Sequence, residues 1–128
     1  MSDLQPIEIG FTPVPPRFPI GRVVCTDWVN NSAEASPAFW DFVVASMKRY
    51  LQCDWGDTCP EDAEQNNLAW DKTDHNRLLA VYNLPLPLQR PKLAASDIMD
   101  RDGQPVQSIW IITEYDHSVT TVLFPSEY

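Results

Sequence analysis

Carboxylate side chains gather around one glycine turn near the middle of the chain. Asp54 and Asp57 lie in the turn, and Glu61, Asp62 and Glu64 follow shortly after it. Carboxylate oxygens are the ligands that hard cations such as Mg²⁺ and Ca²⁺ prefer. One hypothesis is therefore a small metal-dependent hydrolase that uses Asp54, Asp57 and Glu61. The ligand spacing of a calcium-binding loop is absent, so the cluster matches no recognised metal motif.

The same turn has a structural interpretation as well. Gly56 supplies a positive φ, a conformation that strains other residues, and Trp55 anchors the turn against the core. Asp57 or Thr58 then caps the helix that follows. Both interpretations of the turn stay open at this point.

Other side chains of catalytic type lack the spacing that chemistry requires. Cys53 and Cys59 form neither the close pair of a zinc site nor a redox CxxC motif. His75 and His117 each follow an aspartate, but no nucleophile elbow accompanies them. The four glycines form neither a dinucleotide-binding nor a phosphate-binding loop, which excludes nucleotide-dependent catalysis of those two kinds. We therefore predict no catalytic residue, no cofactor and no metal ion, and we expect a protein that is not an enzyme.

The charge of the chain favours a protein partner over a nucleic acid. It carries 18 acids and 9 bases, for a formal net charge of -9, whereas nucleic-acid binders present a basic surface. Seven of the acids lie between positions 54 and 74, where Lys72 is the only base. We predict that this segment contacts a protein with a basic surface. The predicted contact residues are Asp54, Trp55, Asp57, Glu61, Asp62 and Glu64.

Composition favours a cytoplasmic protein with one hydrophobic core. Hydrophobic residues make up 44% of the 128 positions, and no apolar stretch is long enough to span a membrane. The first residues, MSDLQPIEIG, lack the basic region of a secretory signal. The three cysteines form no even disulfide framework, as expected in a reducing compartment. We expect no contact with membranes.

Two segments carry the signals of helices. Ser36 and Pro37 begin a helix that runs to residue 51, with apolar residues at spacings of three and four and bases in its last turn. Thr58 to Glu61 repeats the start signal and predicts an acidic surface helix over 60–74. The polar segment 30–32 is expected to be a turn.

Four segments rich in β-branched and aromatic residues predict strands, at 20–26, 77–82, 108–113 and 119–124. A hairpin loop at 114–117 joins the last two. The predicted class is α+β, in the order β-α-α-β-β-β. We expect two helices packed on one face of an antiparallel sheet of about four strands.

Prolines divide the chain into an arm and a domain. Residues 1–19 contain five prolines and predict an extended arm, because proline restricts φ and has no N–H. Residues 20–128 are expected to form a single α+β domain. An irregular excursion with four prolines interrupts this domain at 84–107 and ends near a turn at Asp102-Gly103.

Several segments carry a resemblance to a known family. They are Gly21-Arg-Val-Val, the turn Asp54-Trp-Gly-Asp57, Leu78-Leu-Ala-Val-Tyr82, and the sequences SIWIITE and TTVLFPSEY near the end of the chain. In these residues the chain resembles a family of small, uncharacterised bacterial proteins often met on plasmids, phages and other mobile elements. Members are sometimes labelled as a type I restriction enzyme modification subunit. This chain lacks the cofactor glycine loop and the NPPY-type motif of a methyltransferase and so departs from that label.

The resemblance implies a mobile-element context and supplies no active site. Combined with the acidic segment, it favours a non-enzymatic protein-binding module, and specifically an inhibitor of a host enzyme that handles nucleic acid. Acidic side chains would compete with DNA phosphates for a basic cleft. The small metal-dependent hydrolase is the alternative.

Overall fold

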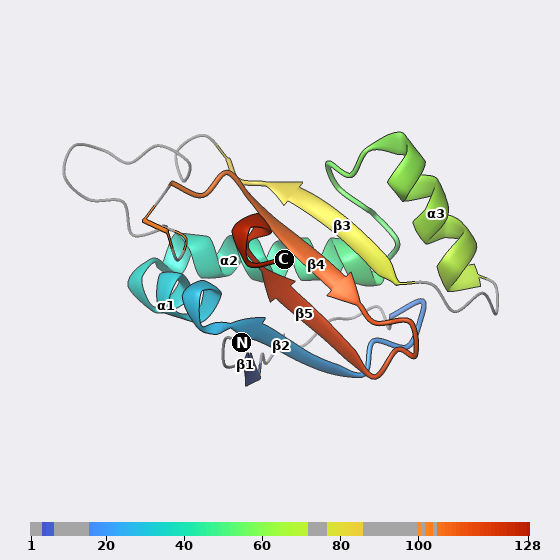
Figure 1. The fold of residues 1–128 in the computed structure, drawn as a ribbon, viewed down its shortest axis with the longest axis horizontal. Helices are drawn as coiled ribbons and strands as arrows, with labels where there is room; N and C mark the ends of the chain where they lie inside the picture. Colours follow the sequence, from blue (N-terminus) through green and yellow to red (C-terminus); the bar gives the residue numbers. More distant parts are fainter. Residues whose placement is uncertain (1–3, 7–15, 72–76, 86–99, 101, 104) are drawn as a thin grey trace.

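A five-stranded mixed sheet lies at the centre of the fold, which the computed structural model describes over residues 4–6, 16–71, 77–85, 100, 102–103 and 105–128. The strands are β1 (Leu4–Pro6), β2 (Arg22–Thr26), β3 (Leu78–Asn83), β4 (Ser108–Thr113) and β5 (Val119–Leu123). They lie side by side in the order β1-β2-β5-β4-β3 (Figure 1). The four predicted strands are confirmed, and so is the α+β class.

The sheet differs from the predicted antiparallel one in two ways. β2 pairs with β5 in parallel, with Arg22 beside Val119, while the other neighbouring pairs are antiparallel. β1 is a fifth strand, paired with β2 inside the segment expected to be an arm. Its proline is tolerated because an edge strand leaves one side without a hydrogen-bonding neighbour. Strand direction depends on contacts between distant segments, and local sequence patterns do not contain this information.

Helix α2 (Pro37–Leu51) confirms the strongest helix prediction. The Ser36 side chain caps it by accepting a hydrogen bond from the Phe39 N–H at 3.2 Å, and Pro37 occupies its first position. Its apolar side is buried against the sheet, with Phe39, Val43 and Met47 each almost completely enclosed. These residues belong to the apolar series, at spacings of three and four, that predicted the helix.

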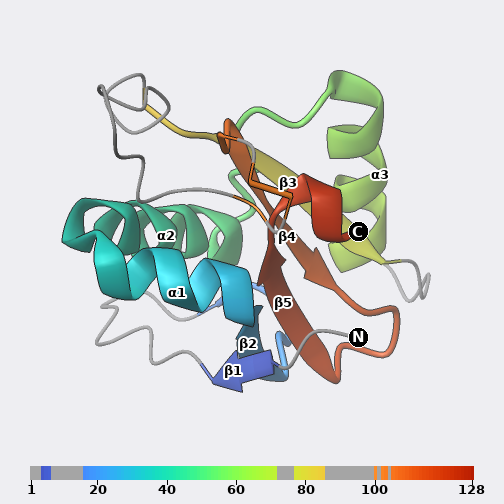
Figure 2. The same ribbon diagram turned by 60° about the vertical axis from the view of Figure 1, so that its left-hand side comes forward.

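Helix α1 (Asp27–Ala35) replaces the turn that was expected around residues 30–32. The Thr26 side chain caps it by accepting from the Val29 N–H at 3.4 Å. The helix is mostly polar and buries only Val29 and Ser32, so its apolar stripe contains too few residues to distinguish it from a polar turn. α1 and α2 lie on the same side of the sheet (Figure 2).

Helix α3 (Pro60–Asp71) confirms the second helix prediction but not its expected place. It lies against β3 at the edge of the sheet and does not share the layer of α2 (Figures 1 and 2). Its inward side chains within the described residues are small or polar: Ala63 is half-buried, and Asn66 and Ala69 are buried. A helix without a broad apolar stripe would bury little apolar surface by packing on the face of a sheet.

The core lies between α2 and the sheet and encloses one chain of hydroxyl groups. Tyr50, Thr113 and Thr120 have no exposed surface, and their oxygens are 2.7 and 2.8 Å apart in that order. The Thr120 hydroxyl donates to the Ile20 carbonyl at 2.7 Å. Each hydroxyl has one hydrogen, so Thr113 must donate to Thr120, and Tyr50 to Thr113. Every member of this buried chain is thereby satisfied.

The end of the proline-rich segment packs on the domain. The Arg17 N–H donates to the Leu51 carbonyl at 2.9 Å, and Phe18 is buried. Residues 1–3, 7–15 and 86–99 lie outside the described part of the chain, which leaves the expected arm and excursion described only at their ends. At the end of the excursion, Gly103 has a φ of 74° and its N–H donates to the Asp100 carbonyl, which confirms the predicted turn.

Candidate functional site

An ion pair closes the turn that joins α2 to α3. Asp54 accepts hydrogen bonds from Arg49 Nε and Nη2 at 2.8 and 3.2 Å, and from the Gly56 N–H at 3.1 Å. The hydrogen bond from the Arg49 guanidinium keeps the pKa of the Asp54 carboxyl below its usual value. Gly56 has a φ of 64°, which confirms the predicted positive φ. Asp54 is therefore exposed but already paired with a cation.

Trp55 lies beneath this turn rather than on its surface. Its side chain is 7% exposed, and its ring centroid lies 5.5 Å from that of Tyr50 and 6.0 Å from that of Phe18. The indole N–H donates to Asn67 Oδ1 at 2.8 Å. The predicted anchoring role of Trp55 is confirmed. A ring enclosed in this way offers little area to a partner.

Asp57 and Thr58 form hydrogen bonds with β3. The sequence instead predicted that one of them caps the next helix. The Asp57 N–H donates to the Val81 carbonyl at 2.7 Å, and Asp57 Oδ2 accepts from the Asn83 N–H at 2.8 Å. Thr58 Oγ1 accepts from the Val81 N–H at 2.9 Å. The turn thus occupies the outer edge of β3 much as a neighbouring strand would.

Asn66, in α3, also bonds to the outer edge of β3. Together with residues 54–58 it seals this edge, which means that it occupies the outward backbone groups of the strand. Its Oδ1 accepts from the Leu79 N–H at 3.1 Å, and its Nδ2 donates to the Leu79 carbonyl at 2.8 Å. The side-chain amide therefore satisfies both outward backbone groups of one strand residue. An edge sealed in this way cannot pair with another chain. Sequence patterns do not reveal this role, because Asn66 is one polar residue among several in a polar helix.

Three acids in the first half of α3 point away from the body of the protein. Glu61, Asp62 and Glu64 are exposed, and none of them forms an ion pair with another side chain that the structure describes. Leu68, two turns along the helix from Glu61, is 45% exposed. We call Glu61, Asp62 and Glu64 the acidic face of α3. This face is an exposed helix surface whose negative charge has no ionic partner among the described side chains.

The carboxylates do not converge on a metal centre. Among the residues that the structure describes, no three His, Cys, Asp or Glu side chains lie close enough to hold a metal ion. Asp54 is paired with Arg49, and Asp57 is bonded to β3. His75 lies outside the described residues. The hydrolase hypothesis therefore finds no ligand set in the part of the molecule that can be described.

His117 has a structural environment in the loop between β4 and β5. Its Nδ1 forms a 2.6 Å hydrogen bond with the Pro19 carbonyl, and its φ is 58°. The neighbouring Asp116 accepts from the Ser118 N–H and hydroxyl rather than from the imidazole. The three side chains are thus adjacent without the relay of a nucleophile, a base and an orienting acid.

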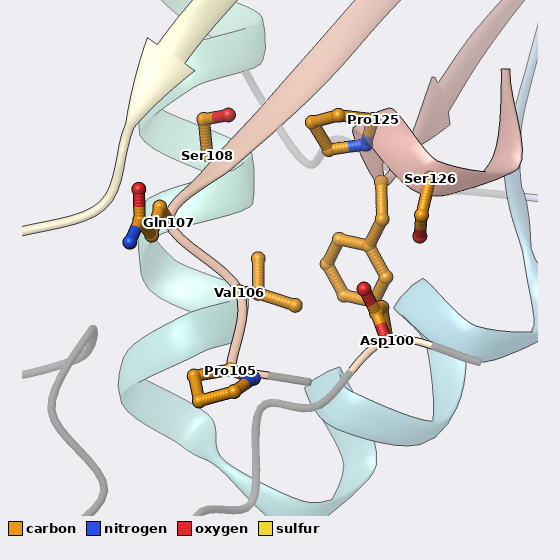
Figure 3. Close-up of a pocket in the computed structure, with 8 residues that line it drawn as sticks. Asp100, Pro105, Val106, Gln107, Ser108, Pro125 and Ser126 are labelled. Atoms are coloured by element: carbon orange, nitrogen blue, oxygen red, sulfur yellow. The ribbon is translucent and has the colours of Figure 1, made fainter. Parts of the chain in front are cut away.

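A pocket that the sequence did not indicate lies at one end of the sheet (Figure 3). Its volume is about 340 Å³. Its lining includes the buried side chains of Val106 and Phe124, the rings of Pro105 and Pro125, and four polar side chains. The polar residues are Asp100, Gln107, Ser108 and Ser126. Among the described residues that line it, none is a His or a Cys, so the common pairing of a Ser or Cys nucleophile with a His base is absent from them.

Within the described residues, no helix is both long and apolar enough to cross a membrane. Comparison with known proteins adds no family and no function, because no protein-family model, curated protein or solved structure matches this chain.

Proposed function

We propose that this chain is a non-enzymatic protein-binding module, and that the acidic face of α3 contacts a basic surface on its partner. The observation that carries the proposal is the display of Glu61, Asp62 and Glu64 on an exposed helix without cationic partners among the described side chains. Unpaired charge on an exposed surface attracts a partner of opposite charge and speeds their encounter.

The proposed partner is a host enzyme that handles nucleic acid, bound in the basic cleft where DNA or RNA would lie. A row of carboxylates on a helix presents negative charges that resemble those of a phosphate backbone. The resemblance to small proteins of plasmids and phages supports this choice, since such elements meet host enzymes that act on their nucleic acid. Leu68 beside the acids would add an apolar contact at the end of the helix.

The remaining predicted contact residues have different roles in this proposal. Asp57 is exposed, and one of its carboxylate oxygens accepts from the Asn83 N–H. The carboxylate as a whole adds negative charge near the start of α3. Asp54 contributes less because Arg49 neutralises it. Trp55 supports the turn from below and makes no direct contact.

Two charge-matched variants test the proposal. The first carries Glu61→Gln, Asp62→Asn and Glu64→Gln. The control carries Glu34→Gln, Asp41→Asn and Asp102→Asn, which are exposed acids elsewhere on the molecule. Both variants lose the same three charges, so a difference between them reports on position rather than on net charge.

The measurement is quantitative affinity capture from a bacterial lysate at about 0.05 M and about 0.5 M salt. We expect the unmodified chain and the control to retain the same basic protein at low salt, and the α3 variant to lose it. Added duplex DNA should displace the captured protein, because both would occupy one surface. Equal capture by the two variants, or no selective capture at low salt, would contradict the proposal.

A further inference from the structure

The seal on the outer edge of β3 has two halves with different anchorage. Residues 54–58 form the first half, which bonds to Val81 and Asn83. It is tied to the core by the buried ring of Trp55 and by the Tyr82 hydroxyl, which donates to the Asp54 carbonyl at 2.6 Å. Removal of this half would expose a large aromatic ring, so it is expected to stay in place until the whole domain unfolds.

The second half is α3, and its described contacts with the sheet are slight. Ala63 and Ala69 are the apolar side chains that it turns inward within the described residues, and alanine burial contributes little compared with the burial of an aromatic ring. Leu68, the larger described apolar side chain of the helix, remains 45% exposed. The directional contacts are the amide of Asn66, which bonds to both backbone groups of Leu79, and Asn67 Oδ1, which accepts a hydrogen bond from the Trp55 indole N–H at 2.8 Å.

We infer that α3 is a detachable cover of the β3 edge, and that Asn66 is the latch that holds it closed. In the open state α3 leaves the sheet while the core and residues 54–58 remain folded. The Leu79 N–H and carbonyl are then unpaired at the edge of the sheet. Opening uncovers these two groups, while residues 54–58 still occupy the outward groups of Val81 and Asn83. This inference does not depend on the proposed function, which requires only that α3 be displayed.

Backbone hydrogen exchange tests this inference at single residues of one strand. Successive residues of an antiparallel strand direct their N–H groups to opposite sides. The Leu79 N–H points to Asn66, so the Ala80 and Tyr82 N–H groups point to β4. The Leu79 amide therefore reports on α3, and the Ala80 and Tyr82 amides report on the core.

In the unmodified chain, we expect the amides of Leu79 and α3 to exchange together and faster than those of Ala80 and Tyr82. Low urea should accelerate exchange at Ala80 and Tyr82 more strongly, because global unfolding exposes more surface than local opening. NMR-detected exchange measures all of these amides in one experiment. Equal protection of Leu79, α3 and Tyr82 with equal urea dependence would overturn the inference.

Asn66→Ala, with Gln65→Ala as the matched control, tests the latch. Loss of two ordinary hydrogen bonds should accelerate exchange of Leu79 and α3 by roughly 10- to 100-fold. Ala80 and Tyr82 should keep their rates, and Gln65→Ala, at an exposed position, should behave as the unmodified chain. A uniform acceleration of every amide in Asn66→Ala would show that α3 opens only with the core. If Asn66→Ala fails to fold, the urea series on the unmodified chain decides alone.

Discussion

At the scale of single residues, the buried hydroxyl chain from Tyr50 through Thr113 and Thr120 to the Ile20 carbonyl has one direction. Thr113 and Thr120 are its two middle members, and Thr120 both accepts from Thr113 and donates to Ile20. Tyr50 is at the donor end and accepts from no other member of the chain. Removing the Tyr50 hydroxyl leaves the other bonds intact, whereas removing the Thr120 hydroxyl leaves the buried Thr113 hydroxyl without its acceptor and the Ile20 carbonyl without this donor.

Thr120→Val should therefore destabilise the protein more than Tyr50→Phe does. We expect a loss of about 1 kcal/mol in the free energy of unfolding for Tyr50→Phe and of about 2 to 4 kcal/mol for Thr120→Val, from the usual costs of a lost bond and of unpaired buried groups. Urea unfolding monitored by tryptophan fluorescence gives both values. Equal losses would mean that the chain does not have the direction deduced here.

The residues of the turn show how far local sequence predicts a site. The positive φ of Gly56 and the anchoring by Trp55 follow from residue type, and both predictions are correct. The hydrogen bonds of Asp57 and Thr58 were predicted wrongly, because the same oxygens that cap helices also bond to a strand edge. Thr58 bonds to Val81, which lies more than twenty positions later in the chain. Whether its hydroxyl caps a helix or bonds to β3 therefore depends on how the chain folds back, and local sequence patterns contain no information about that.

At the scale of elements, the segment before β2 packs closely on the loop between β4 and β5. Gly21 has a φ of 62°, and a Cβ atom there would lie 2.3 Å from the Ser118 carbonyl oxygen. The Arg22 N–H donates to that same oxygen at 3.0 Å. Gly103 has a similar φ of 74°, but a Cβ atom there would meet nothing within 4 Å. The two glycines thus separate the effect of backbone conformation from that of crowding.

Gly103→Ala should cost about 1 kcal/mol of stability, from the left-handed backbone alone. Gly21→Ala should cost at least about 2 kcal/mol more, because the added methyl group collides with the backbone of a neighbouring element. Thermal unfolding of both variants measures the difference, and failure of Gly21→Ala to fold is the extreme of the same result. Similar melting temperatures for the two variants would contradict the close packing.

Elements were predictable where sequence signals agreed, and otherwise not. In α2, the Ser36 cap, Pro37 and the apolar spacing all indicate one helix. In α1, the Thr26 cap stands alone beside polar residues that also suit a turn. β1 contains Pro6 and has only three residues, too few for an alternating pattern. Tertiary packing rather than local preference decides both of these elements.

At the scale of the whole molecule, the three cysteines report on the integrity of the fold. Burial raises the pKa of the Cys25 thiol to about 12 and that of the Cys53 thiol to about 11, whereas Cys59 is exposed. Alkylation requires the thiolate, so near pH 8 the Cys25 thiol should react roughly a thousandfold more slowly than an unperturbed thiol. Reaction at Cys53 should increase as the pH approaches 11.

Mass spectrometry after brief treatment with iodoacetamide should find one modified cysteine, Cys59, in the folded protein. The same treatment in urea should modify all three. Rapid native modification of Cys25 would show that the layer between α1, β2 and the C-terminal segment opens readily. The control is the unchanged fluorescence of the protein before and after modification.

The position of β5 between β2 and β4 also has a consequence for biosynthesis. β5 leaves the ribosome after the other four described strands, yet it pairs with both β2 and β4 and so joins the two halves of the sheet. Until β5 has been made, β2 lacks its neighbour on the inner side of the sheet. The apolar surfaces of α1 and α2 then have no complete sheet to pack against. The sheet therefore stays incomplete until β5 has been made, a period in which chaperones would be most valuable.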